Sequence, residues 1–237
     1  SYIHAFVCKM NLIRSSLFYL IFYSWTIIFF IIFSPVKFFS YHFVLKLAKF
    51  WTGSVIELSR IILNINYELI GLENIPKERF FLLASNHQSA WETFFFSFFF
   101  NKSVFVLKKE LRKIPLMSWY FQKLGFIFID RDKGFKSIKQ IINSVTVLKK
   151  KGVKTLIIFP EGTRTKINEN GEINTGVFAI HKILKIPILV LKHNAGKYWQ
   201  NKKFIKKAGT IQIQIFPVIN KINKKKLFVE KIKELFY

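Results

Sequence analysis

The feature that most limits how this chain can fold is a run of 22 residues without a charge, Ser15–Val36. Phe, Ile, Leu, Tyr and Trp make up most of it, and as one helix it would extend about 33 Å, enough to cross a hydrocarbon core. No convincing small-residue cleavage site follows, so we expect the segment to be retained rather than removed as a signal peptide. Pro35 is the expected end of the helix. A helix buried in a protein core is the alternative.

The segment Lys37–Leu63 mixes apolar positions with charged ones, which predicts an amphipathic helix at a membrane interface. With the apolar helix expected over 15–36, it forms a predicted membrane anchor over residues 1–66, and residues 67–237 form a second predicted domain. Two geometries fit the anchor: one span followed by a surface helix, or a hairpin that dips into one leaflet.

Basic residues flank the apolar run unequally. Lys37, Lys46 and Lys49 follow it, whereas Lys9 and Arg14 precede it. Because Lys and Arg favour the cytoplasmic side of a membrane, we expect the part of the chain after the run to face the cytoplasm. The expected location is the inner membrane of the cell, with residues 67–237 on its cytoplasmic face.

After Gly71 the pattern changes to alternating strands and helices. Short apolar runs predict strands at Phe80–Ser85, Val104–Leu107, Phe126–Ile129, Thr155–Phe159, Ile186–Leu191 and, at an edge or half-buried, Thr210–Ile219. Helices are expected at Ala90–Phe100, from Ile138 to a stop near Gly152, at Val177–Leu184 and at Lys224–Phe236. This alternation predicts an α/β fold with a mostly parallel central sheet flanked by helices, preceded by the membrane-associated helical segment.

The net charge of +25 requires an anionic partner such as a membrane surface, a nucleic acid or an acidic carrier. A coding bias toward Lys, Ile, Asn and Phe is the alternative source of this charge. Mean hydropathy is +0.26, high for a soluble enzyme, which favours contact with lipid. Only one cysteine, Cys8, is present, so neither a disulfide nor a cysteine metal cluster can form within the chain.

His87 and Glu92 are the first candidates for catalytic chemistry. On one regular helix, five residues place two side chains about 140° apart, so they would not meet. If His87 instead lies in the turn after the predicted Phe80–Ser85 strand, Glu92 in the first turn of the next helix can reach back to it. One ring nitrogen then bonds the carboxylate, and the other is free to remove a proton. A solvated histidine in a helix-capping turn is the alternative.

A second string, Phe159–Arg164, ends a predicted strand with an acid, a glycine and an arginine. Gly162 permits a positive φ angle or a close backbone approach. Arg164 can clamp a phosphate with two hydrogen bonds, and Glu161 can fix that arginine or accept from a substrate hydroxyl. An ordinary strand-ending turn is the alternative for this string alone. Combined with the histidine–acid pair and the turn Ile129–Arg131, it favours acyl transfer onto the hydroxyl of a phosphorylated acceptor.

In the order of these motifs the chain resembles the glycerolipid acyltransferases, most closely the branch that acylates lysophosphatidate. The resemblance spans Tyr67–Phe216, and it implies the glycerolipid acyltransferase version of the α/β fold, with residues 67–237 as the catalytic domain. Four blocks carry it: Asn86–Glu92, Gly125–Arg131, Phe159–Arg164 and Ile186–Leu191. The segment Val106–Leu111 also resembles a family segment.

By this resemblance, His87 is a general base oriented by Glu92. It is expected to deprotonate the free 2-hydroxyl of 1-acylglycerol 3-phosphate. The alkoxide then attacks the thioester of an acyl carrier protein or of coenzyme A, which yields phosphatidic acid for phospholipid biosynthesis. The resemblance implies no covalent acyl-enzyme, no cofactor and no metal.

The resemblance also assigns residues to the acceptor, with the arginines on its phosphate: Arg131, Glu161, Gly162, Thr163, Arg164 and, at the phosphate or the oxyanion, Lys108. A solvated lysine is the alternative for Lys108. The family usually has Asp where this chain has Glu92, and the extra methylene moves the carboxylate by about 1.5 Å, which backbone placement can absorb. His193, beside the fourth block, is expected to be structural.

The motifs do not separate lysophosphatidate from another lysolipid or from glycerol 3-phosphate as the acceptor. A non-enzymatic alternative is a basic protein that binds membranes or nucleic acid. The uncharged run and the lack of a recognisable nucleic-acid module argue against nucleic acid, as do aromatic residues gathered in apolar runs rather than among basic ones. By the resemblance, the expected partners are a phospholipid membrane, lysophosphatidic acid and the thioester donor, and no nucleic acid.

Overall fold

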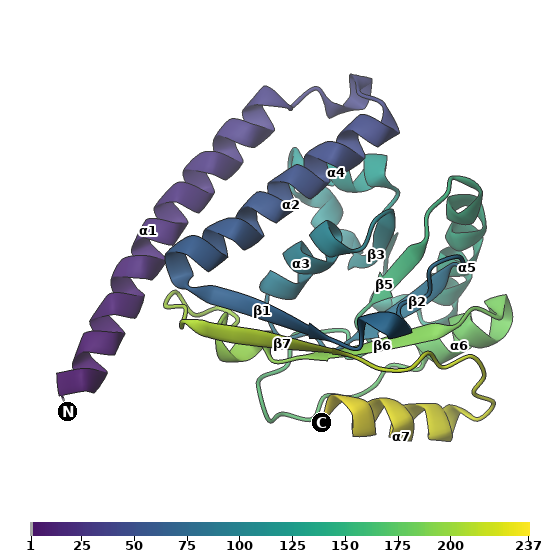
Figure 1. Cartoon of the computed structure of the whole chain (residues 1–237). Coiled ribbons are helices and arrows are strands. Elements are labelled where there is room, and N and C mark those ends of the chain that lie inside the picture. The colour runs from purple at the N-terminus through teal and green to yellow at the C-terminus, as the bar shows by residue number, and fades with distance from the viewer. Residues whose placement is uncertain (1) are drawn as a thin grey trace.

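Over residues 2–237, which the computed structural model describes apart from the side chains of Ile3, His4 and Arg131, the chain folds into a seven-stranded sheet covered by helices on both faces (Figure 1). The strands are β1 (Ile65–Ile70), β2 (Phe81–Ser85), β3 (Ser103–Lys108), β4 (Ile127–Ile129), β5 (Thr155–Ile158), β6 (Ile188–His193) and β7 (Gly209–Ile215). Their order in the sheet is β1-β7-β6-β2-β5-β3-β4.

The sheet is mostly parallel, as the alternation of strands and helices predicts. All neighbouring strands pair in parallel except β6 and β7, which are antiparallel. Strand β7 lies between β1 and β6, so the expectation that it could be an edge strand is wrong and the half-buried alternative is confirmed. Its isoleucines Ile211, Ile213 and Ile215 are buried, and the alternating Gln212 and Gln214 are exposed.

Two cores lie on opposite faces of the sheet, because successive strand side chains point to opposite sides. In β2, Leu82 and Ala84 pack under α5 (Phe135–Lys150), α6 (Gly176–Leu184) and α7 (Lys225–Phe236). Phe81 and Leu83 pack on the other face with α3 (Trp91–Phe99) and α2 (Tyr41–Leu63). A strand buried on both faces must be apolar throughout, which is why β2 could be predicted from its composition.

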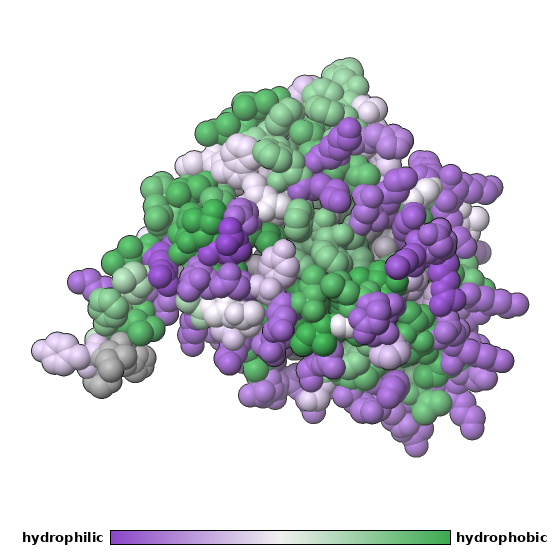
Figure 2. Space-filling model, viewed as in Figure 1, coloured by the Kyte–Doolittle hydropathy of each residue, from purple (hydrophilic) through white to green (hydrophobic). Residues whose placement is uncertain are grey.

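Helices α1 (Tyr2–Ile32) and α2 lie side by side as a hairpin (Figure 1). Helix α1 ends at Ile32, three residues before Pro35, which was the expected stop and lies in the turn between the two helices. It begins at Tyr2, well before the apolar run. Over Ala5–Ile32, α1 is long and apolar enough to cross a membrane, by length and composition alone. Apolar residues gather on the surface along this hairpin, as Figure 2 shows.

A third core joins the hairpin to α4 (Met117–Leu124). Phe29 and Phe30 of α1 and Trp51 of α2 pack around Tyr120, whose hydroxyl donates to the carbonyl of Phe33 at 2.9 Å. The C-terminal half of α1 is thus attached to the rest of the molecule. Short 3-10 helices complete the chain at Val36–Phe38, Leu72–Asn74, Lys109–Lys113, Arg131–Lys133 and Ala195–Lys197.

Candidate active site

The candidate motifs follow the carboxyl ends of neighbouring parallel strands. Strand β2 lies between β5 and β6, so the segment after Ser85 is flanked by those after Ile158 and His193. The segments after β3 and β4 continue along the same edge. Parallel strands point the same way, so motifs far apart in the sequence converge at one edge, where α/β sheets carry their sites.

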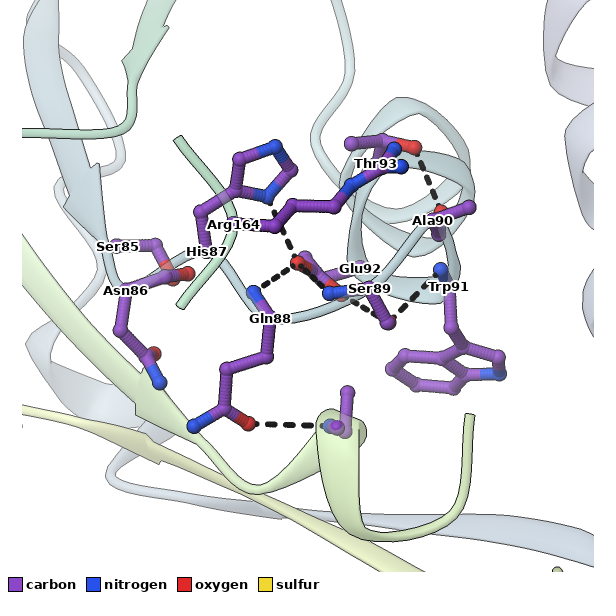
Figure 3. A network of polar contacts seen from close by, with 12 residues as sticks. Ser85, Asn86, His87, Gln88, Ser89, Ala90, Trp91, Glu92, Thr93 and Arg164 are labelled. Carbon is purple, nitrogen blue, oxygen red and sulfur yellow. Dashed lines mark hydrogen bonds and ion pairs between the residues drawn. The ribbon is translucent and has the colours of Figure 1, made fainter. Parts of the chain in front are cut away.

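The His87–Glu92 pair has the geometry that its spacing predicts. His87 lies in the loop after β2, and Glu92 is the second residue of α3. The Nδ1 atom of His87 is 2.9 Å from Oε1 of Glu92 (Figure 3). Because a carboxylate can only accept, Nδ1 carries the proton in this bond and Nε2 is left as an acceptor. The catalytic roles of both residues stay predictions.

Glu92 is fully buried and is satisfied by donors from its own loop. Its Oε1 accepts from the backbone N–H groups of Gln88 and Ser89, each at 2.8 Å, and its Oε2 accepts from the Ser89 hydroxyl. Burial alone raises the pKa of a carboxyl, but the electrostatic influence of the nearby His193 and His87 rings and the hydrogen bonds from His87 and Ser89 outweigh it. The pKa of Glu92 is therefore held well below its ordinary value, and Glu92 is an anion at neutral pH.

The His87 ring is fixed from two sides. One face stacks on the ring of Phe159, with centroids 4.0 Å apart and planes 15° apart, and its edge is held by Glu92. The second ring nitrogen points away from Glu92 (Figure 3). With 15% of its side chain exposed, His87 is reachable from outside but largely shielded from water.

Asn86 and His193 clamp the loop that carries His87. The Asn86 side chain donates to the His193 carbonyl at 2.8 Å and accepts from its N–H at 3.0 Å. The buried His193 ring accepts from Ala195 N–H at Nδ1, so its Nε2 donates to the Asn86 carbonyl, 2.9 Å away. Burial lowers the pKa of His193, which keeps the ring neutral. These contacts agree with a structural role for His193.

Glu161 follows the neighbouring strand β5 and braces the loop that carries His87. Its Oε2 accepts from the backbone N–H of His87 at 2.6 Å, and its Oε1 accepts from the Tyr237 and Thr165 hydroxyls at 2.6 and 3.2 Å. Thr165 N–H in turn donates to the His87 carbonyl at 2.8 Å. Burial raises the pKa of Glu161, although these bonds oppose it. Both carboxylate oxygens are directed at protein donors rather than outward.

The rest of the second motif lies at the surface. Gly162 has φ of 69°, so the predicted positive φ angle is confirmed. Thr163 and Arg164 are exposed, and Nη1 of Arg164 donates to the Asn201 side chain at 3.1 Å.

The remaining two predicted acceptor residues follow β3 and β4. Lys108 ends β3, is exposed, and lies 3.8 Å from Glu110. Arg131 begins a short 3-10 helix after β4, and its side chain is outside the described part of the chain. Within that described part, no group of three His, Cys, Asp or Glu residues could hold a metal ion.

An apolar cavity of about 470 Å³ lies beside His87, and we refer to it as the apolar cavity. Helices α1 to α4 and strand β3 form its wall, with side chains that include Phe22, Phe30, Trp51, Phe94, Leu107 and Tyr120. Three polar residues of the candidate site also line it: His87, Lys108 and Arg164. An apolar chain can therefore reach the histidine while remaining shielded from water.

Three residues that bond the Glu92 or Glu161 carboxylate were not predicted from the sequence: Ser89, Thr165 and Tyr237. Ser89 had a usable signal, because Ser followed three residues later by Glu at a helix start is a capping-box pattern. That pattern explains why the Glu92 carboxylate folds back on its own loop. Tyr237 had no such sequence signal, because it lies 76 positions from Glu161 and only the folded structure brings the two together.

Comparison with known proteins gives a consistent result. A family model described as "Acyltransferase" matches residues 66–192. A 1-acyl-sn-glycerol-3-phosphate acyltransferase of Pseudomonas aeruginosa is 40% identical over 215 residues, which cover 88% of this chain and 81% of that protein. A Saccharomyces cerevisiae enzyme of the same name is 29% identical over 183 residues, covering 74% of this chain and 60% of that protein.

The fold also has a solved counterpart. The crystal structure of the 1-acyl-sn-glycerophosphate acyltransferase PlsC from Thermotoga maritima superposes with a TM-score of 0.76. The match covers 95% of this chain and 94% of that one at 22% sequence identity. At that identity the likeness establishes the α/β fold with its N-terminal helices.

Proposed function

The chain belongs to the acyltransferase family, and from that premise we propose that it acylates the sn-2 hydroxyl of 1-acyl-sn-glycerol 3-phosphate to form phosphatidic acid. The observation that carries the proposal is the His87–Glu92 pair in the wall of an apolar cavity. The name of the Pseudomonas aeruginosa relative supports this acceptor. The donor is an acyl thioester of acyl carrier protein or of coenzyme A.

In the proposed reaction, Nε2 of His87 takes the proton of the acceptor hydroxyl. The oxygen attacks the thioester carbonyl carbon, the carbon–sulfur bond breaks, and the imidazolium returns its proton to the leaving thiolate. Glu92, held as an anion, orients the ring through Nδ1 and stabilises the imidazolium. Such a base contributes roughly 10²–10⁴ in rate.

The apolar cavity supplies the site for an acyl chain. Its volume of about 470 Å³ falls within the range typical of ligand sites. Its lining is mostly aromatic and aliphatic, and the ionisable groups His87, Lys108 and Arg164 also line it, so the bound chain can leave its polar end at the base. This arrangement excludes water from the thioester, which limits hydrolysis as a competing reaction.

The acceptor phosphate is assigned to the basic residues at the strand ends. Arg164 and Lys108 are both exposed, and both line the apolar cavity. Arg131 is proposed as the third cation. Gly162 and Thr163 form the turn that presents Arg164, and Glu161 contributes by fixing that turn to the His87 loop rather than by direct contact.

The α1–α2 hairpin is proposed as the membrane anchor, within residues 1–66, for a catalytic domain over 67–237. Exposed apolar side chains on α1, among them Leu20, Ile27 and Ile31, suit contact with lipid tails. Because Tyr120 and its neighbours hold the C-terminal half of α1 against the domain, we favour a hairpin in one leaflet over a full span. The proposed location is the inner membrane, with the catalytic domain on its cytoplasmic face.

The test is an acyl-transfer assay on membranes that contain the protein, with 1-acylglycerol 3-phosphate and either thioester donor. Wild-type protein is expected to form phosphatidic acid, and His87→Ala is expected to lose the activity with its fold intact. Comparison of the two donors identifies the carrier. If neither donor gives product with 1-acylglycerol 3-phosphate but another lysolipid or glycerol 3-phosphate is acylated, the acceptor assignment is wrong and the family assignment stands.

A further inference from the structure

A second cavity, of about 390 Å³, lies between α1 and the loop that follows β6, and we refer to it as the basic cavity. Tyr19 and Tyr23 of α1 line one side, and the segment 199–206 lines the other. The basic cavity shares Tyr23, Ala90 and Arg164 with the apolar cavity, so the two adjoin at the candidate site.

The charge of the basic cavity is unbalanced. Among the described residues that line it there are four basic side chains and no acidic one: Arg164, Lys202, Lys203 and Lys206. Burial, and after it the charge of Arg164, lowers the pKa of Lys206 to about 8. Two cations thus lie close enough to repel each other with no carboxylate between them, an arrangement that an anion would relieve.

Lys206 is buried and held by neighbouring groups rather than free on the surface. It is 4% exposed, and its ammonium lies 5.3 Å from the Trp199 ring centroid and 5.8 Å from that of Tyr19. Its Nζ donates to the carbonyls of Gln200, at 3.1 Å, and Lys203. An ammonium has three donors, so one remains for a ligand.

We infer that Lys206, in the basic cavity, is a further cationic contact of the lipid acceptor's phosphate beside Arg164, which lines both cavities. This inference rests on the proposed function and adds Lys206 as a substrate-binding residue that no motif contains. A phosphate monoester has the charge and the oxygens to bond both cations at once.

The position of the basic cavity favours the acceptor over the donor as the source of the phosphate. One wall is α1, the proposed anchor helix, and the neighbouring cavity is apolar. A lysolipid that enters along α1 can therefore place its phosphate on the basic side, with the glycerol near His87 where the two cavities adjoin. The phosphates of a thioester donor are the competing source, and the experiment separates the two.

The experiment compares Lys206→Met with Lys207→Met in the full-length protein. Met keeps the four-atom stem of the Lys206 side chain without its ammonium and can pack between Tyr19 and Trp199, whereas Lys207 is exposed and outside the basic cavity. KM for 1-acylglycerol 3-phosphate is expected to rise about 10- to 100-fold in Lys206→Met, as for loss of a charged hydrogen bond. The kcat value and the donor KM are expected to change little, and Lys207→Met is expected to match wild type.

A second measurement uses the wild type, so that the test does not depend on Lys206→Met folding correctly. Inorganic phosphate is expected to inhibit competitively against the acceptor and not against the donor. A rise in donor KM in Lys206→Met, or phosphate competition with the donor, would overturn the acceptor assignment. Unchanged acceptor KM in a folded Lys206→Met would overturn the site itself. Lack of activity in wild type would instead overturn the proposed function.

Discussion

At the scale of single residues, Glu92 shows how a longer acid occupies a position where the resembling family has Asp. Its extra methylene is absorbed because Glu92 lies in the first turn of α3 and its carboxylate folds back toward the preceding loop. There it reaches the backbone N–H groups of Gln88 and Ser89 as well as Nδ1 of His87. The spacing alone predicted the His87 contact, but not the backbone donors that hold Glu92 in place.

The first prediction concerns Glu92→Gln. The amide oxygen can replace Oε1, and the amide nitrogen can donate to the Ser89 hydroxyl, so the fold is expected to persist. The negative charge that stabilises the imidazolium is lost, and kcat is expected to fall about 100-fold or more. The checks are kcat and the melting temperature, with the exposed Glu68→Gln as the control. Retained activity in Glu92→Gln would remove the carboxylate from the mechanism.

The second prediction concerns stability as a function of pH. The pKa of Glu92 is lower in the folded protein than in the unfolded chain, where it is about 4.3. The unfolded chain therefore binds more protons between the two values, and stability is lost as pH falls through that window. The melting temperatures of wild type and Glu92→Gln are expected to differ by a constant amount above about pH 5, and the difference is expected to shrink as pH falls from about 4.3 toward about 2. A difference that stays constant in acid would show that Glu92 is not an anion in the fold.

The hydrogen-bond partners of Glu161 could not be predicted from the sequence. The sequence places Glu161 in a turn with Arg164, where an acid suits either an ion pair or a substrate hydroxyl, and the family resemblance assigns it to the acceptor. Its carboxylate is instead directed at His87 N–H and Tyr237, partners on other elements. Motif spacing identifies which strand ends meet, but it does not say which side chain is turned inward.

At the scale of elements, patterns identified most of the sheet and its helices because buried strands are continuously apolar. Strand β1 was missed because only its first residue, Ile65, is buried, so neither alternation nor an apolar run marks it. Helix α4 was missed because it is eight residues long and lies between Pro115 and Gly125. Both are held by tertiary contacts, β1 by pairing with β7 and α4 by packing against the hairpin.

The third prediction concerns Tyr237, which follows helix α7 and bonds the Glu161 carboxylate that braces the His87 loop. Tyr237→Phe removes the bond to Glu161 and the acceptor for the Gly171 N–H. Because Glu161 still holds the His87 N–H, we expect a loss of about 1 kcal/mol in stability and a fall in kcat of about three- to tenfold. The measurements are thermal unfolding and steady-state kinetics.

The control for this variant is Tyr67→Phe. Among the described residues, the Tyr67 side chain contacts aromatic rings, and the structure gives its hydroxyl no hydrogen bond. Equal kcat in Tyr237→Phe and Tyr67→Phe would mean that α7 supports only the fold. A lower kcat in Tyr237→Phe alone would indicate that the brace through Glu161 positions the catalytic loop.

At the scale of the whole molecule, the hairpin is both part of the fold and the most apolar surface. Phe18 of α1 and Ile56 of α2 belong to the same core as Trp91 and Phe95 of α3. The outward side chains of α1 are largely apolar, whereas hydrophilic residues dominate the side that carries α5 (Figure 2). The sequence indicated an anchor and a domain as successive segments, but only the packing reveals that they share a core.

The fourth prediction separates charge from apolar contact in membrane binding. The net charge of +25 is expected to speed association with anionic vesicles, and raising the salt concentration is expected to slow it. Once inserted, the apolar hairpin is insensitive to screening, so a high-salt wash should not release the protein. Vesicle flotation with anionic and zwitterionic lipids measures both stages.

Ile27→Asp, at a position 58% exposed on α1, is expected to make the bound protein extractable by salt. Release of the wild type by salt would mean that charge alone holds it, and the hairpin would then be a structural element rather than an anchor.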